Sequence, residues 1–171
     1  MTDFEFTEKV NVYKNMIFRL AIAYLKNIQD AEDITQDVFI KFYKHKKGFK
    51  TANDEKAWLI RVTINASKDL LKSAWLRRTV PIVDDIPFVH EEQSDLFYAV
   101  HKLEAKYRVV IHLYYYEDYS VKEIAKVLGI RETTIQTRLY RARKQLESLL
   151  NKDSQVYKGS NFKEGLYETG I

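Results

Sequence analysis

The sequence has 171 residues, yet it contains no cysteine, only two prolines and only five glycines. Without cysteine, the chain forms neither a disulfide bond nor a thiolate metal site, and this composition is typical of a cytoplasmic protein. Both prolines fall within residues 79–94, and three of the glycines follow residue 151. The long remaining spans lack helix breakers, so we expect an all-α protein in two parts.

Long apolar runs are also missing, so we expect no membrane insertion of this chain. The first ten residues, MTDFEFTEKV, lack the basic start and the apolar stretch of a signal peptide. The four histidines have no metal-ligand spacing, and no glycine-rich loop precedes a helix. We therefore expect no metal, no cofactor and no catalysis by the chain itself.

Neither sign of charge dominates, because 28 Lys and Arg residues stand against 24 Asp and Glu residues, a net charge of +4. This excess is too small for a polycation, so the arrangement of the charges matters more than their sum. Acidic residues gather at 30–37 and 84–95, and basic residues gather at 68–78 and 131–144. The pattern favours separate acidic and basic surfaces.

Hydrophobic periodicity predicts three helices in the first half and three or four shorter helices after Asp95. Asp30 and Asp54 are the expected N-caps of the second and third helices. The expected helices of the first half cover 4–26, 30–47 and 54–77. We therefore divide the chain into four segments. They are a helical domain at 1–78, a flexible acidic linker at 79–94, a second helical domain at 95–151 and a loose tail at 152–171.

The stretch SVKEIAKVLGIRETTIQTRLYRARKQL has the features of a helix-turn-helix. Ser120 and Glu123 can form a capping box, and Gly129 can take the positive φ of the sharp turn. The second helix then buries an apolar stripe and presents a polar face to the major groove. The residues expected on that face are Thr133, Gln136, Thr137, Tyr140, Arg141 and Lys144. An ordinary helical hairpin with a solvated basic face is the alternative.

The third predicted helix, DEKAWLIRVTINASKDLLKSAW, has two faces. The expected core stripe comprises Trp58, Leu59, Val62, Ala66 and Leu70. Arg61, Asn65, Lys68 and Lys72 form a second line at helical spacing. Asn is a poor helix former, so Asn65 on a basic face suggests a base contact. A solvated face with an incidental Asn is the simpler alternative for this helix taken alone.

The second predicted helix, DAEDITQDVFIKFYKHKK, places Asp33, Gln36 and Asp37 away from its apolar stripe. An acidic patch repels the phosphates of DNA but suits a basic protein surface. The preference of a helix N-terminus for acidic residues is an alternative that explains Asp33 well and Asp37 less well.

Together these stretches resemble the sigma-70 family of RNA polymerase sigma factors, in its extracytoplasmic-function group. The resemblance covers about residues 10–150. YLKNIQDAEDITQDVFIKFYK is similar to the part of sigma domain 2 that docks on polymerase, and FKTANDEKAWLIRVTINASKDLLK to the part that melts and reads the −10 element. YSVKEIAKVLGIRETTIQTRLYRARKQL is similar to sigma domain 4, which reads the −35 element.

The resemblance implies roles for particular residues. Asp33, Gln36 and Asp37 would dock on the β′ clamp helices of core RNA polymerase, and the second domain on its β flap. A loop at 50–56 would hold a flipped base of the non-template strand. The residues implied at the −10 element are Lys50, Thr51, Ala52, Asn53, Arg61, Asn65 and Lys68. Two positions depart from the family pattern: Asp69 stands where Asn is common, and Gln136 stands where a basic residue is common.

The implied function is that of a sigma factor, which directs promoter-specific initiation by core RNA polymerase. Its implied partners are core polymerase, promoter DNA and an anti-sigma factor. The second hypothesis is a helix-turn-helix regulator that binds DNA without docking on polymerase. A footprint on duplex DNA in the absence of polymerase would favour that regulator.

Overall fold

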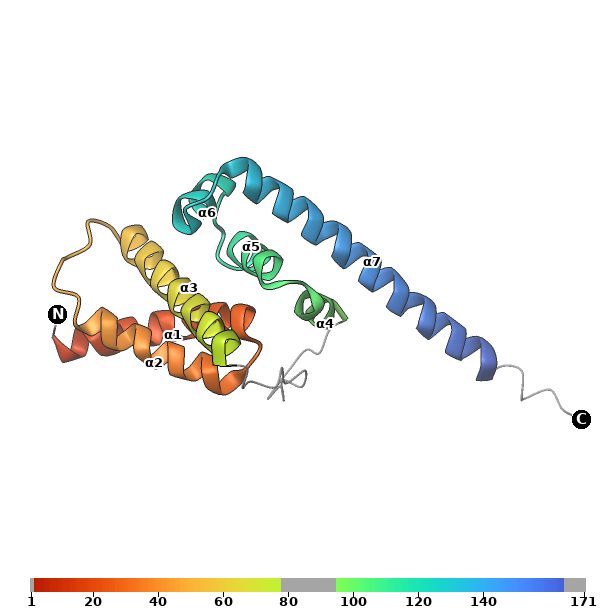
Figure 1. The fold of residues 1–171 in the computed structure, drawn as a ribbon, viewed down its shortest axis with the longest axis horizontal. Helices are drawn as coiled ribbons and strands as arrows, with labels where there is room; N and C mark the ends of the chain where they lie inside the picture. The colour runs from red at the N-terminus through yellow and green to blue at the C-terminus, as the bar shows by residue number, and fades with distance from the viewer. Residues whose placement is uncertain (1, 78–94, 165–171) are drawn as a thin grey trace, which may run out of the picture.

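The computed structural model describes residues 2–77 and 95–164. Within these residues the chain forms seven helices and no strand, which agrees with the all-α prediction (Figure 1). The predicted linker at 79–94 lies outside the described residues. The helices fall into two groups, α1–α3 and α4–α7.

The first group begins with α1 (Asp3–Leu25) and α2 (Ile28–Tyr43), which are followed by α3 (Ala52–Arg77). The side-chain oxygen of Asn27 accepts a hydrogen bond from the backbone N–H of Asp30 at 2.9 Å. Asn27, not Asp30, is therefore the N-cap of α2, and the predicted cap was wrong by three residues. The same helix ends at Tyr43, four residues earlier than predicted.

The start of α3 was also predicted too late. The hydroxyl of Thr51 accepts a hydrogen bond from the backbone N–H of Asp54 at 3.1 Å. Asp54 therefore lies inside the first helical turn and not at the cap. In both helices an earlier polar residue provides the cap, and the aspartate lies in the first turn, where its charge suits the helix dipole.

The second group comprises four helices: α4 (Asp95–Lys102), α5 (Ala105–Tyr115), α6 (Val121–Leu128) and α7 (Glu132–Glu164). Helix α7 continues through residues 152–164 of the segment for which the sequence predicted a loose tail. Residues 165–171 lie outside the described part. Residues 152–164 are mostly polar and so offer few apolar side chains for packing. They contain no proline, however, so the backbone hydrogen bonds of α7 can continue through them.

The buried face of α3 differs from the predicted stripe. Leu59, Ile60 and Ile64 are almost fully buried, whereas Trp58 and Val62 are only half-buried. Ala66 and Leu70, also assigned to the stripe, are half-buried too. Two polar residues, Thr63 and Ser67, lie in the core, and the Thr63 hydroxyl donates to the carbonyl of Leu59 at 2.8 Å. A hydropathy pattern assigns polar residues such as these to the exposed face. The predicted core stripe of α3 therefore lay on a different side of the helix from the observed one.

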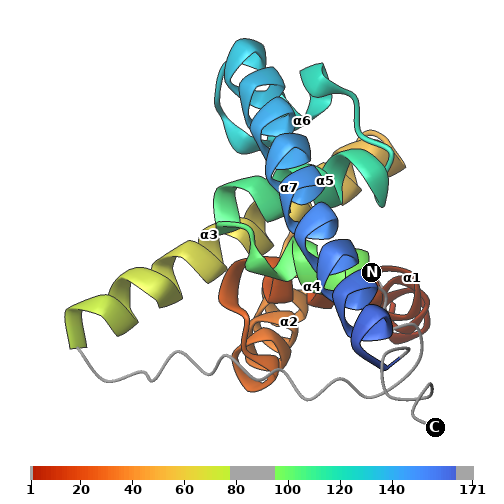
Figure 2. The ribbon, with the colours of Figure 1, turned by 90° about the vertical axis from the view of Figure 1, so that its right-hand side faces the viewer.

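The two groups pack directly against each other. Helix α5 lies against α1, and α6 lies against the first half of α3. The buried side chains of both groups form one continuous core, which includes Leu20 of α1 and Leu113 of α5. The second half of α3 projects away from the other helices (Figure 2). The sequence pattern predicted only a linker between the groups and gave no sign of this packing.

Candidate nucleic-acid interface

Helices α6 and α7 form the predicted helix-turn-helix. The backbone N–H of Glu123 donates to the Ser120 hydroxyl, and the Glu123 carboxylate accepts from the Ser120 N–H at 2.9 Å, so the capping box is present. Gly129 ends α6 with φ +66°. Its left-handed conformation turns the chain into α7 with little strain, because glycine has no Cβ.

The first turns of α7 bury one side and expose the other. Ile135, Leu139 and Ala142 are buried against the core. All six predicted DNA-contacting side chains are exposed on the opposite side: Thr133, Gln136, Thr137, Tyr140, Arg141 and Lys144. The Thr137 hydroxyl donates to the Thr133 carbonyl at 2.8 Å, so its proton is held within the helix. The described geometry therefore leaves the Thr137 methyl group and the long side chains to meet a groove.

Three arginines of α7 differ in their availability. Arg141 is exposed, whereas Arg138 is half-buried. The Arg143 Nε donates to the Tyr115 hydroxyl at 2.9 Å, and its guanidinium lies 5.5 Å from the centre of the Tyr114 ring. Tyr115 and Tyr114 thus hold Arg143 beside α5. Arg143 is exposed as well, but these contacts tie its guanidinium to α5, so Arg141 is the exposed arginine of α7 that is better placed to reach a groove.

The predicted basic line on α3 is an exposed face in the structure. Arg61, Asn65, Lys68 and Lys72 are all exposed, with Asp69 beside them. The helix turns of α3 thus place one amide side chain between cationic neighbours. An amide carries both donor and acceptor groups, which suits a base edge, and the cations suit phosphates.

The loop predicted at 50–56 is largely helical. Lys50 and Thr51 precede α3, but Ala52 and Asn53 already belong to its first turn. All four side chains are exposed. They therefore form a helix N-terminus, where free backbone N–H groups attract negative charge. The prediction of a loop pocket was wrong for the part after Thr51.

Aromatic rings pack beneath the N-terminal end of α3. The −10 site predicted from the sequence did not include these residues. The His45 ring lies 4.9 Å from the Phe49 ring and 4.6 Å from the Trp58 ring, measured between centroids. Phe42 packs beneath them, 6.1 Å from both Phe49 and Trp58. The run of aromatics within the lysine-rich stretch 42–50 was the available signal. The rings fix the connection between α2 and α3.

The predicted acidic docking face lies on α2. Asp33, Gln36 and Asp37 are exposed there. Ile40 and Tyr43 continue the same face toward the end of the helix, and their side chains are 50% and 52% exposed. The exposed face therefore places apolar side chains beside carboxylates, as a protein interface does when its apolar centre is bordered by a polar rim. The sequence pattern had assigned no role to Ile40 or Tyr43.

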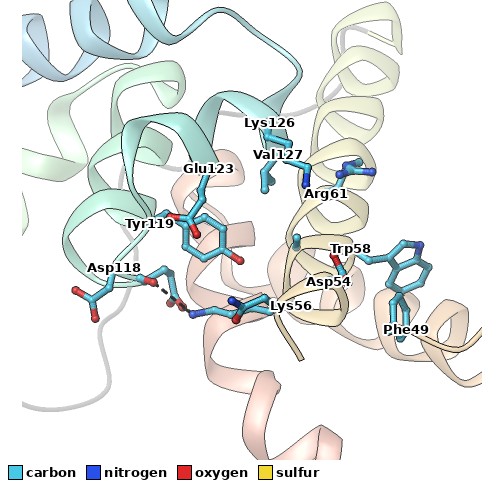
Figure 3. Close-up of a pocket in the computed structure, with 13 residues that line it drawn as sticks. Phe49, Asp54, Lys56, Trp58, Arg61, Asp118, Tyr119, Glu123, Lys126 and Val127 are labelled. Atoms are coloured by element: carbon cyan, nitrogen blue, oxygen red, sulfur yellow. Dashed lines mark hydrogen bonds and ion pairs between the residues drawn. The ribbon is translucent and has the colours of Figure 1, made fainter. Parts of the chain in front are cut away.

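A cleft of about 450 Å³ lies between α3 and the α5–α6 turn (Figure 3). Asn53, Lys56 and Arg61 line it from α3. The opposite wall carries Glu117, Asp118 and Glu123, together with Tyr119 and Lys126. The walls therefore bring predicted −10 residues of the first group next to carboxylates of the second group.

One ion pair spans this cleft. The Lys56 Nζ lies 2.9 Å from Oε2 of Glu117, and the Nε2 of His112 lies 3.4 Å from Oε1 of the same carboxylate. Burial opposes ionisation of Glu117, but its close contacts with His112 and Lys56 outweigh it, so the pKa of Glu117 is lowered. Burial, with help from the carboxylates of Glu123 and Glu117, raises the pKa of Tyr119 to about 12.

Two family models match this chain. "Sigma-70 region 2" matches residues 10–77, and "Sigma-70, region 4" matches residues 95–146. The chain belongs to the sigma-70 family of RNA polymerase sigma factors. Its relatives include the RNA polymerase sigma factor SigV of Bacillus subtilis, which is 30% identical over 82% of this chain and 88% of its own. The ECF sigma factor SigW of the same organism is 28% identical over 85% of this chain and 88% of its own.

Solved structures share the fold of this sigma factor. The sigma factor RpoE of Bartonella quintana, solved with the anti-sigma factor NepR, aligns with a TM-score of 0.70. The alignment has 23% identity and covers 86% of this chain and 97% of that one. CnrH, solved with the cytosolic domain of CnrY, aligns with a TM-score of 0.63 at 24% identity over 89% and 91% of the two chains.

The family assignment identifies the chain as a sigma factor of the extracytoplasmic-function group, which directs promoter-specific initiation by RNA polymerase. It does not favour the alternative of a DNA-binding regulator that acts without polymerase. In the part of the chain that the structure describes, no helix has the length and apolar character needed to cross a membrane.

Proposed function

We propose that this sigma factor reads its promoter with two separate faces, the outer face of α7 and the exposed face of α3. The observation that carries this proposal is the placement of the predicted contact residues. Six polar side chains share the exposed side of α7, and Asn65 lies between Arg61 and Lys68 on α3. Each face is backed by a buried apolar side, so folding itself turns the polar residues outward.

On the −35 element, α7 enters the major groove as the recognition helix of the helix-turn-helix. Arg141 makes a bidentate base contact, because its guanidinium is exposed while that of Arg143 is held by Tyr115. Gln136, Tyr140 and Thr133 contact neighbouring base edges or phosphates, and Lys144 contacts a phosphate. Thr137, whose hydroxyl proton stays within the helix, offers its methyl group to a thymine methyl.

On the −10 element, the α3 face binds the non-template strand. Asn65 reads a base, and Arg61 and Lys68 attract the adjacent phosphates. The four residues at the start of α3 hold a flipped base next to it: Lys50, Thr51, Ala52 and Asn53. The rings of Phe49 and Trp58 support this site from below, since they fix the position of the preceding chain.

Core polymerase binds to the exposed face of α2. Asp33, Gln36 and Asp37 form its polar part and meet the β′ clamp helices, and the exposed side chains of Ile40 and Tyr43 add apolar area. The second helical group meets the β flap. In this proposal residues 1–78 form the first domain, 79–94 connect it to the second domain at 95–151, and 152–171 form a tail.

The remaining expectations follow from this role. The chain makes no bonds itself, because RNA synthesis belongs to core polymerase. It acts in the cytoplasm, where bacterial DNA and polymerase are found. The similar sigma factor RpoE of Bartonella quintana was solved with the anti-sigma factor NepR. We therefore expect an anti-sigma factor that controls this chain as well.

Run-off transcription with core RNA polymerase on a library of promoter sequences tests the proposal. Transcripts should require both the sigma factor and the polymerase, and should come from templates with two preferred elements. The matched measurement is a footprint of the chain alone on the selected duplexes. Strong protection without polymerase, together with no run-off product, would contradict the proposal and favour an independent DNA-binding regulator.

A further inference from the structure

Glu55 is a carboxylate that α3 turns inward in its first turn. The residue is only 8% exposed, whereas Ala52 and Asn53 beside it are exposed. The helix dipole favours acidic residues in a first turn, but an exposed carboxylate such as Asp54 meets that preference equally well. Charged side chains are almost never buried unless they are paired. The burial of Glu55 therefore indicates a specific partner.

The partner is Lys9 of α1. Its Nζ lies 2.6 Å from Oε1 of Glu55, and the Glu55 side chain is 11% exposed while the Lys9 side chain is 38% exposed. Tyr13, one turn further along α1, is buried beside the pair, and the Lys9 Nζ lies 5.9 Å from the centre of its ring. Burial, together with the nearby Glu55 carboxylate, raises the pKa of Tyr13 to about 12, so its hydroxyl keeps its proton. Two side chains of α1 thus surround one carboxylate of α3.

The backbone of the first turn connects Glu55 to the residues before it. The Glu55 N–H donates to the Thr51 carbonyl at 3.2 Å. The Thr51 hydroxyl accepts from the backbone N–H of Asp54 at 3.1 Å and donates to the Asp54 carboxylate at 3.0 Å. Thr51 is one of the four residues, 50–53, that we assign to the flipped base. Its position therefore depends on where the Glu55 side chain is held.

Stability alone does not account for a buried ion pair at this place. Withdrawing two charges from water costs free energy, and well-packed apolar side chains in their place are often equally stable or more stable. A fully paired polar contact, however, has one preferred geometry and makes its surroundings rigid. The end of a helix is also where its backbone frays most easily. The Lys9–Glu55 pair therefore gives the start of α3 a defined position on α1.

We propose that Lys9 and Glu55 are positioning residues for the −10 site, which hold the first turn of α3 on α1 so that residues 50–53 can receive a flipped base. The inference rests on the proposed −10 role of those residues. A flipped base gives up its stacking in the duplex, so the site that receives it has to be held in place beforehand. Polymerase docking, which we assign to the exposed face of α2, does not involve the pair.

Base flipping by the holoenzyme tests this role. Promoter duplexes selected by run-off transcription carry 2-aminopurine beside each position of the −10 element in turn, where its fluorescence rises when the neighbouring base leaves the stack. Lys9→Met should keep core polymerase binding and lower this signal on the order of ten-fold. Lys9→Arg retains a cation within reach of Glu55 and should flip the base normally. The matched control is Lys14→Met, which removes an exposed lysine from the same helix and should also behave as the wild type.

A doubly apolar variant separates positioning from stability. Lys9→Met combined with Glu55→Leu leaves no charge unpaired, so its free energy of unfolding should equal or exceed that of the wild type. It should nevertheless lose base flipping as Lys9→Met does. Wild-type flipping in either variant would overturn the inference. Equal losses of core polymerase binding and of flipping in the double variant would show a general defect and would overturn it as well.

Amide hydrogen exchange of the free chain tests the positioning contact without any promoter. The N–H groups of Asp54 and Glu55 are bonded to Thr51, so their exchange reports opening of the first turn. Both rates should rise on the order of ten-fold in Lys9→Met and stay unchanged in Lys14→Met. Unchanged rates in Lys9→Met would refute the positioning role. If the wild-type holoenzyme flips no base, the proposed −10 role fails, and the exchange rates still decide whether the pair holds the start of α3.

Discussion

Arg108→Met is a sharp test of how the two halves of the protein are held together. Methionine keeps an unbranched side chain of similar length but removes the guanidinium. The carbonyls of Ala23, Tyr24 and Leu103 then lose a charged donor in a buried place. Each buried acceptor without a partner costs roughly 1–3 kcal/mol. The three together give a gross loss of roughly 3–9 kcal/mol.

Removing the charge also relieves the cost of burying it. Burial lowers the pKa of Arg108 from its ordinary 12.5 to about 10. That difference corresponds to about 3 kcal/mol of opposition to the charged form. Water will reach some of the freed carbonyls, which reduces the gross loss. The difference is roughly 0–6 kcal/mol, and we expect Arg108→Met to lower the free energy of unfolding by about 2–4 kcal/mol, near the middle of that range.

Urea unfolding can also locate this loss. Both tryptophans of the chain lie in α3, so their fluorescence reports on the first helical group, whereas far-UV circular dichroism reports on all helices. The two transitions should coincide in the wild type and separate in Arg108→Met. The control is Arg19→Met, an exposed arginine of α1, which should change the stability by less than about 0.5 kcal/mol. A similarly small change in Arg108→Met, with coincident transitions, would refute the assigned role.

Four further predictions concern single residues. Asp37→Lys should weaken core polymerase binding in a pull-down without loss of helix content, and wild-type binding would show that the docking face is misassigned. Arg141→Ala should cost about 1–3 kcal/mol in promoter binding and relax the preference at one −35 base pair. A loss spread evenly over all promoter variants would instead make it a phosphate contact. Asn65→Ala should fold and bind core polymerase but open duplex promoters poorly, as permanganate reactivity of unpaired thymines would show. Normal opening with an unchanged −10 preference would remove Asn65 from the site. Because the pKa of Glu117 is lowered in the folded protein, its stabilising effect is present above its ordinary value of 4.5 and is lost as the pH falls below it. The free energy of unfolding should therefore fall in acid, as urea titrations at several pH values would show, and Glu117→Gln should remove that part of the pH dependence.

Features that depend on neighbouring residues could be predicted from the sequence. The helix-turn-helix is the clearest example, because Ser120, Glu123 and Gly129 act within a few residues of their partners. The exposed positions of Asn65 and Arg141 follow equally directly from helical spacing. The helix starts at Asn27 and Thr51 were missed because several polar residues in succession can each act as a cap, and the pattern does not choose between them.

Features that join distant residues could not be predicted in this way. Arg108 and Ala23 are 85 residues apart, and a lone arginine in an apolar helix gives no indication of its acceptor. The same holds for Lys56 and Glu117, which are 61 residues apart. Charged residues are usually exposed, so a sequence reading assigns them to the surface by default. These residues join the two halves together with the shared apolar core, and their pairing emerged only in the structure.

The continuous helix α7 has a mechanical consequence. It runs from the residues that we propose for the −35 groove to Glu164, and 33 residues at 1.5 Å each give a rod of about 50 Å. A helix resists bending over this distance, so a small tilt of the DNA-reading end becomes a large displacement at the far end. A fluorophore or a bulky fusion attached at the C-terminal end of α7 would therefore move farther than the N-terminal end each time the helix reorients during the transcription cycle.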